Sequence, residues 1–198
     1  MADSHPAASN PDRPTTLALL KEYTRNESLI KHGLAVEACM RAYARKLDPA
    51  NEEKWAVTGL IHDFDYDQFP TPDEHPYVGE KILEDRGYPA DVRRAIMSHA
   101  EYTGVKRETP MEKALFACDE LAGFLTACAL VKPTKSIFEV EAPSVIKKMK
   151  DKAFARSVNR DDIRNGAAEL GVELADHVTF CIQAMQGAAD ELGLKGTG

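Results

Sequence analysis

Six side chains of the types that bind first-row divalent metals occur in segments that are predicted to be buried. Neutral imidazoles and carboxylates suit such ions, and helical bundles build dinuclear sites from side chains on facing helices. A single inward histidine is more typical of a hydrogen-bonded core residue, and an inward aspartate often caps a neighbouring helix. Their joint occurrence predicts a metal site, because an unpaired buried carboxylate is expensive. The six candidates are His32, His62, Asp63, His75, His99 and Asp119.

The positions of these residues relative to the apolar pattern support that prediction. His62 and Asp63 directly follow the apolar run Gly-Leu-Ile at the end of a predicted helix. His99 continues the inward face of the predicted helix 89–100. His75 begins the inward face of the predicted helix 76–86. Asp119 lies in the most apolar stretch of the chain, residues 111–131. These positions place ionisable side chains in the predicted core, where such side chains are rare.

The elements that must position these residues are all predicted to be helical. Apolar residues recur with a 3.6-residue period, prolines fit first helical turns and glycines fit helix ends, whereas no stretch alternates convincingly with period two. Residues 68–74 and 102–110 are predicted loops. The fold class is therefore all-α, a helical bundle with the metal site in its core. The expected helices span residues 29–47, 52–64, 76–86, 89–100, 111–131, a short lysine-rich segment from 143, 159–170 and 174–192.

The length of 198 residues suits a single domain. We expect a disordered tail over residues 1–14 and one helical domain over 15–198, with a core at 27–131 and C-terminal helices at 143–193. The N-terminus has no apolar core typical of a signal peptide, and the apolar run 114–131 carries two carboxylates that disfavour a membrane span. The four cysteines form no CxxC pair and are expected to be reduced, which favours a cytoplasmic protein.

The net charge is −7, from 25 basic and 32 acidic residues. Such a chain is a poor candidate for nonspecific nucleic-acid binding, which needs a basic surface. The region after Pro143 is locally basic, and it is either a solvated helix face or a lid that attracts an anionic, nucleotide-like substrate. Its cations are Lys147, Lys148, Lys150, Lys152, Arg156, Arg160 and Arg164.

The order of the six candidate ligands resembles that of the HD-domain superfamily. Residues 75–83, His-Pro-Tyr-Val-Gly-Glu-Lys-Ile-Leu, are similar to the HPxxGxxIL element that follows the His-Asp pair in dinuclear members, and Ile-Met-Ser-His at 96–99 resembles the later single histidine. The resemblance covers about residues 29–125. It is closest to an uncharacterised bacterial group of HDIG-type hydrolases whose core reads LLHDFDY, and the likeness continues through residues 135–136 and 154–163.

The resemblance implies a dinuclear centre. His32, His62, Asp63 and Asp119 would hold one metal, and His75 and His99 a second, with Asp63 bridging the two. Iron or manganese would be the ions. A hydroxide that bridges two cations attacks a phosphate ester at neutral pH, so the resemblance implies a phosphohydrolase for a nucleotide or another small organophosphate, with Asp63 and His62 as catalytic residues. The sequence does not decide the oligomeric state, and a homo-oligomer stays open.

One departure from the family concerns the phosphate. Many HDIG proteins place a lysine three residues after the aspartate of the pair, but residues 64–67 here read Phe-Asp-Tyr-Asp. Lys106 and Arg107, in the loop after the His99 helix, are the nearest candidates for substrate binding. Asp65 is a candidate acceptor for a ligand histidine or for a proton.

Two alternatives remain beside the hydrolase. The oxygen-using branch of the superfamily, a mixed-valent di-iron oxygenase, employs the same four histidines and two aspartates. Its gating tyrosine and glutamate match Tyr23 and Glu27 only loosely, and these residues also suit a helix start. A catalytically silent module that binds metal or nucleotide is the second alternative, and the missing lysine favours it slightly.

Overall fold

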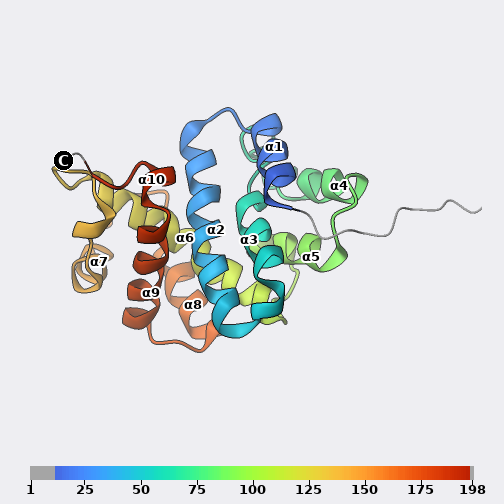
Figure 1. The fold of residues 1–198 in the computed structure, drawn as a ribbon. Coiled ribbons are helices and arrows are strands. Elements are labelled where there is room, and N and C mark those ends of the chain that lie inside the picture. Colours follow the sequence, from blue (N-terminus) through green and yellow to red (C-terminus); the bar gives the residue numbers. More distant parts are fainter. Residues whose placement is uncertain (1–11, 197–198) are drawn as a thin grey trace, which may run out of the picture.

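A computed structural model describes residues 12–196. Its described residues contain ten α-helices, three short 3₁₀ turns and no strand (Figure 1), so the all-α prediction is confirmed. The helices are α1 Arg13–Tyr23, α2 Glu27–Leu47, α3 Glu52–Ile61, α4 Tyr77–Asp85, α5 Ala90–His99, α6 Pro110–Leu130, α7 Ala142–Lys148, α8 Arg160–Leu170, α9 Leu174–Gly187 and α10 Ala189–Leu192.

The centre of the molecule consists of α2, α3 and α6, which pack against one another (Figure 1). Their facing side chains, such as Met40, Leu60 and Leu121, are fully buried. Burial of this apolar surface supplies the main driving force for folding. α4 lies at one end of the bundle, and α7 and α10 lie at the other.

Helix ends follow the local signals in the sequence. Asn26 accepts a hydrogen bond from the Ser28 backbone N–H and caps α2, and Asn159 caps α8 in the same way. Thr109 and Glu112 form a reciprocal capping box at the start of α6. α8 ends at Leu170, as predicted, and Gly171 in the left-handed conformation is its C-cap.

Three boundaries differ from the predictions. Residues 1–11 of the expected tail lie outside the described residues, whereas residues 13 and 14 already belong to α1, because Asp12 caps that helix through the Thr15 N–H. α3 ends at Ile61, and residues 62–68 form turns. The predicted last helix is divided at Ala188, after Gly187, and the change of direction lets Leu192 pack into the core.

The C-terminal part of the chain reaches the central helices through a close crossing of α8 and α6. A Cβ atom on Gly166 of α8 would lie 2.6 Å from the Cα atom of Ala117 in α6. Only glycine permits this approach. The contact holds the first turn of α8, with Asn159 before it, next to the part of α6 that carries Asp119.

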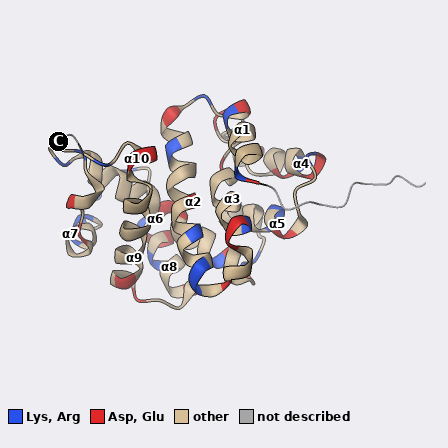
Figure 2. Cartoon of the chain, in the orientation of Figure 1, with Lys and Arg blue, Asp and Glu red and all other residues tan. Residues whose placement is uncertain are grey.

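Charged residues of both signs are interspersed along the surface helices (Figure 2). Within the basic region, Arg160 donates to the carbonyl oxygens of Ala155 and Val158, and the ammonium of Lys148 lies over the ring of Phe154. These two cations therefore stabilise local structure. Among residues 12–196, no helix combines the length and the apolar character needed to cross a bilayer.

Candidate metal centre

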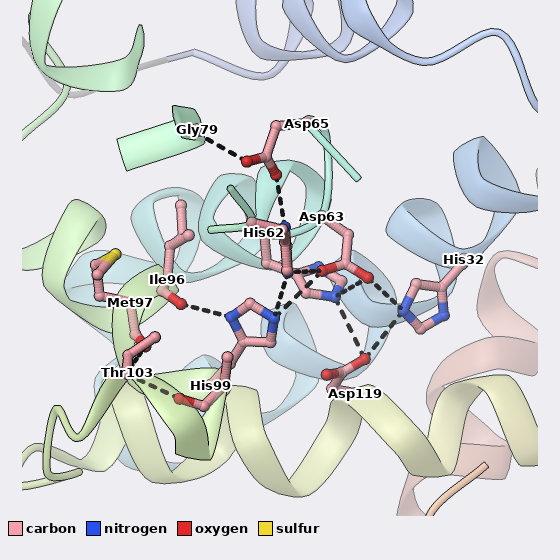
Figure 3. Close-up of polar contacts among 12 residues, drawn as sticks. His32, His62, Asp63, Asp65, Gly79, Ile96, Met97, His99, Thr103 and Asp119 are labelled. Carbon is pink, nitrogen blue, oxygen red and sulfur yellow. Dashed lines mark hydrogen bonds and ion pairs between the residues drawn. The ribbon is translucent and has the colours of Figure 1, made fainter. Parts of the chain in front are cut away.

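The structure brings all six sequence-predicted ligands together in the bundle. Figure 3 shows His32, His62, Asp63, His99 and Asp119 pointing toward one another. They form two groups that share Asp63, and in each group the ligand atoms lie within 4.8 Å of one another. The first group draws on α2, the end of α3 and α6, and the second on the segment before α4 and the end of α5. The groups are His32, His62, Asp63 and Asp119, and Asp63, His75 and His99.

In the first group the imidazoles point at two carboxylates. His32 Nε2 lies 3.0 Å from Asp119 Oδ1 and 3.8 Å from Asp63 Oδ2. His62 Nε2 lies 3.3 Å from the same Asp119 oxygen and 3.5 Å from Asp63 Oδ2. Four donor atoms of the kind that hold divalent metals thus surround one point.

In the second group the other oxygen of Asp63 takes part. Asp63 Oδ1 lies 3.3 Å from His75 Nε2 and 3.2 Å from His99 Nε2, and the two imidazole nitrogens are 3.4 Å apart. The two oxygens of Asp63 therefore face different groups. This is the arrangement expected of a bridging carboxylate.

The orientation of three rings is fixed by hydrogen bonds at their outer nitrogens. His62 Nδ1 donates to the Gly59 carbonyl at 2.8 Å, and His99 Nδ1 donates to the Ile96 carbonyl. His75 Nδ1 donates to Asp65 Oδ1 at 2.8 Å. In the neutral tautomer, each ring then presents an unprotonated Nε2 to the site, as metal-binding histidines do.

In this arrangement, unprotonated imidazole nitrogens face ionised carboxylate oxygens, and all of these atoms are hydrogen-bond acceptors. The Nε2 lone pairs of His75 and His99 face the carboxylate of Asp63, and Asp63 Oδ1 is a buried atom without a hydrogen-bond partner. A buried group of this kind is costly unless a cation satisfies it. The residues present therefore fit two bound divalent metals.

Without a metal, protons must provide the missing positive charge. Burial alone would lower the pKa of His75, but the carboxylates of Asp63 and Asp65 outweigh burial and raise this pKa to about 10. The pKa of His99 is raised in the same way against burial, chiefly by Asp63. Burial would raise the pKa of Asp63, but the neighbouring His62, His75 and His99 hold it well below its usual range.

Asp65 is placed to position His75, as the sequence suggested. Its side chain is only 1% exposed, and its second oxygen accepts the Gly79 backbone N–H at 2.9 Å. A Cβ atom at residue 79 would lie 2.7 Å from this carboxylate, so glycine is needed for the approach. Asp65 is thus held from two sides and fixes the ring of His75.

A cavity of about 550 Å³ opens beside the six residues, and five of them contribute to its wall. The cavity gives a small molecule access to the candidate metal centre. Burial, and next the charge of Asp119, raise the pKa of Glu120 in this wall to about 7. The residues of the wall beyond the candidate ligands are Tyr66, Ala100, Glu101, Tyr102, Phe116, Glu120, Asn159 and Asp162.

Lys106 and Arg107 are not among the residues that line this cavity. The guanidinium of Arg107 is paired with Glu169 at 2.7 Å and with Glu101 at 3.3 Å, and it stacks on Phe116 at 3.6 Å from the ring centroid. The structure therefore does not place either cation in the lining of the cavity. Glu101 and Glu169 hold the guanidinium of Arg107 outside that lining.

Tyr23 and Glu27 do not line the cavity either. The ring of Tyr23 packs edge-on against Phe64. Glu27 is the first residue of α2, where a carboxylate suits the helix dipole. Both residues have structural surroundings that explain them.

Sequence reasoning missed the outer wall of the cavity. Asn159 and Asp162 were predicted only as a helix start, and the packing of α8 on α6 brings them to the site. Glu120 carried a usable signal, since it stands beside Asp119 in the most apolar helix of the chain. A second carboxylate in such a helix needs a polar environment, and the cavity provides it.

A second buried polar cluster lies on the other side of α6. His177 Nε2 donates to the Ala117 carbonyl at 2.8 Å, and the Tyr43 hydroxyl donates to His177 Nδ1 at 2.7 Å. Cys39, Cys118 and Cys181 lie beside it as free, buried thiols. His177 is therefore a packed histidine whose two ring nitrogens are both hydrogen-bonded.

Comparison with known proteins agrees with this geometry. The family model of the HD domain matches residues 29–123, a segment that contains all six candidate ligands. This match supports placing the segment in the HD-domain superfamily, which is generally associated with metal-dependent phosphohydrolases. No curated protein and no solved structure matches the chain.

Proposed function

We propose that this protein is a metal-dependent phosphohydrolase that acts on a small organophosphate at a dinuclear centre. The observation that carries the proposal is the pair of ligand groups sharing Asp63. Each oxygen of that carboxylate faces a different group, and the cavity reaches both groups. The HD-domain match points to the same class of reaction.

Two bound divalent transition metals, iron or manganese, would neutralise phosphoryl charge and make water nucleophilic near neutral pH. The side chains of the protein would position these two metals. His62 and Asp63, the catalytic pair of the proposal, contribute ligand atoms from the end of α3, where the backbone leaves the helix. Asp65 keeps the proton of His75 on Nδ1, so that Nε2 stays available as a ligand.

The test combines metal analysis with turnover. Protein purified without chelators is expected to contain about two metals per chain and to hydrolyse members of a panel of phosphate esters. Asp63→Ala should lose both properties, whereas Asp161→Ala, which removes an exposed carboxylate of α8, should keep them. The absence of metal after reconstitution with iron or manganese, or unchanged turnover in Asp63→Ala, would overturn the proposal.

A di-iron oxygenase is the second candidate, because none of the described residues that line the cavity is Lys or Arg to bind phosphate. Two irons per chain, a paramagnetic signal from the half-oxidised pair and oxygen consumption without phosphate release would establish it. Tight nucleotide binding without any product would instead indicate a silent binding module.

A further inference from the structure

The cavity beside the candidate metal centre has an acidic wall. Apart from the candidate ligands, its described lining includes the carboxylates of Glu101, Glu120 and Asp162 and contains neither Lys nor Arg. Sites for polyanions are usually lined by Arg or Lys, which pair with phosphate oxygens. A second or third phosphate beyond the one at the metals would here meet carboxylates and be repelled.

Two of these carboxylates have no ion-pair partner among residues 12–196. Glu120 accepts only the Asn159 backbone N–H, at 3.1 Å, and Asp162 has no ion pair. Glu101 is paired with Arg107 at 3.3 Å, but that guanidinium lies closer to Glu169, at 2.7 Å. The wall therefore has carboxylates without a cationic partner, and an ammonium group beside them would favour their ionised form.

Aromatic rings complete this wall. Tyr66 and Tyr102, which are 42% and 53% exposed, line the cavity, and so does Phe116, whose ring is already covered by the guanidinium of Arg107. The Tyr102 hydroxyl donates to the His75 carbonyl at 2.8 Å, so its ring is fixed at the cavity. Aromatic faces together with carboxylates attract ammonium groups.

The acidic wall belongs to a cavity that has independent signs of ligand binding. Asp63 Oδ1 is buried, lacks a hydrogen-bond partner and faces the second ligand group. Glu120 and Asp162 line the same cavity as Asp63. They are therefore placed to contact the part of a substrate that extends away from the reacting phosphoryl group.

We propose that the substrate is a small phosphate monoester whose organic part carries an ammonium group, bound by Glu120 and Asp162. This inference rests on the proposed function. It narrows the substrate predicted from the sequence, a nucleotide or another small organophosphate, to amino-alcohol phosphates. Hydrolysis would break the ester P–O bond, transfer the phosphoryl group to water and release the amino alcohol and inorganic phosphate.

Binding of uncleavable analogues tests this inference without turnover. 3-Aminopropylphosphonate matches the shape of phosphoethanolamine, and propylphosphonate lacks only the ammonium group. Calorimetry on the full chain loaded with manganese should give a Kd for the aminated ligand about tenfold lower than for propylphosphonate. Equal affinity, or a preference for propylphosphonate, would overturn the inference.

Neighbouring aspartates of α8 provide a matched pair of variants. Asp161 and Asp162 both lie in the first turn, but only Asp162 lines the cavity. Asp162→Asn should reduce the tenfold preference to about threefold or less, whereas Asp161→Asn should retain it. Glu120→Gln, which keeps an acceptor for the Asn159 N–H, should also reduce it. An equal preference in both aspartate variants and in Glu120→Gln would contradict the assignment.

The two proposals can fail separately. If phosphate esters are hydrolysed but the ammonium group confers no preference, the phosphohydrolase proposal stands and the ammonium inference is wrong. If no ester is hydrolysed and the aminated ligand still binds preferentially, the ammonium site stands and the reaction is wrong. If neither phosphonate binds and no ester is cleaved, both are wrong.

Discussion

Two polar clusters that contain buried histidine flank α6, and they differ in how their polar atoms are paired. In the cluster of Tyr43 and His177, one imidazole nitrogen accepts a hydrogen bond from the tyrosine hydroxyl. The other nitrogen donates to a backbone carbonyl, so both ring nitrogens are satisfied. In the candidate metal centre, the outer nitrogens of His62, His75 and His99 are paired, but their inner nitrogens face carboxylates and each other.

The difference shows that burial of a histidine does not by itself indicate a metal site. His62 and His177 are equally inaccessible, at 0% and 1% exposure. What distinguishes them is the direction of the unshared lone pair. At His177 it meets a hydroxyl donor, whereas at His62 it meets Asp63 and Asp119, which supply no proton when ionised.

The largest effect is expected from removing the shared ligand. Asp63→Ala should abolish both metals and reduce turnover on the order of 10³-fold or more, because this carboxylate faces both groups. His99→Ala should remove only one metal, since His99 belongs to one group. Metal analysis of both variants gives the answer, and an identical loss in each would show that the two groups are not separate sites.

A smaller effect is expected from the residue that positions His75. Asp65→Asn keeps the shape of the side chain but weakens the charge-assisted bond to Nδ1. Metal affinity of the second group should fall about 10–100-fold, whereas the first group should keep its metal. Competition with a graded series of chelators measures both affinities, and equal weakening of both metals would contradict this role.

The pH dependence of stability should change sign on metal removal. In metal-free protein, the raised pKa of His75, about 10, contributes stability that is complete below the unfolded pKa near 6.5 and is lost as the pH rises toward 10. The free energy of unfolding should therefore fall between pH 7 and 9, by about 1 kcal/mol per pH unit for this group.

Metal-loaded protein should not show that decline, because metal binding needs neutral imidazoles and strengthens as the pH rises. Urea unfolding at pH 7 and pH 9, with and without chelator, compares the two forms. The destabilisation caused by the chelator is expected to be greater at pH 9. A smaller effect of the chelator at pH 9 would argue that no metal occupies the histidine groups.

The smallest effect is expected in the satisfied cluster. Tyr43→Phe removes the donor to His177 Nδ1 and should lower the free energy of unfolding by about 1 kcal/mol, the contribution of a single hydrogen bond. Metal content and turnover should not change. Loss of metal in this variant would show that the two clusters are coupled through α6.

Much of this fold could be predicted from the sequence, because its determinants are local. Asn26, Asn159 and Gly171 set helix ends through caps that involve only neighbouring residues. The six candidate ligands were recognisable because their residue types conflict with the apolar pattern around them. The end of α3 was less predictable, since apolar Phe64 continues the pattern beyond Ile61 although the backbone turns.

The remainder depends on contacts between distant segments. Arg107 was a candidate for phosphate binding, but Glu169, which is 62 residues away in sequence, holds its guanidinium. The acidic wall has the same origin, because Asp162 reaches the cavity only through the crossing of α8 and α6. The local sequence pattern predicts neither the ion pair of Arg107 with Glu169 nor the position of Asp162 at the cavity.

The close contact between Gly166 and Ala117 has a consequence for how this protein could be altered. Gly166 lies outside the segment matched by the HD-domain family model, and Ala117 lies inside it. The contact therefore joins α8, which brings Asp162 to the cavity, to the matched segment, which carries the six candidate ligands together with Glu101 and Glu120. Exchanging residues 159–171 for a different helix with glycine at the crossing would change the part of the cavity wall formed by Asn159 and Asp162 and leave the six candidate ligands in place.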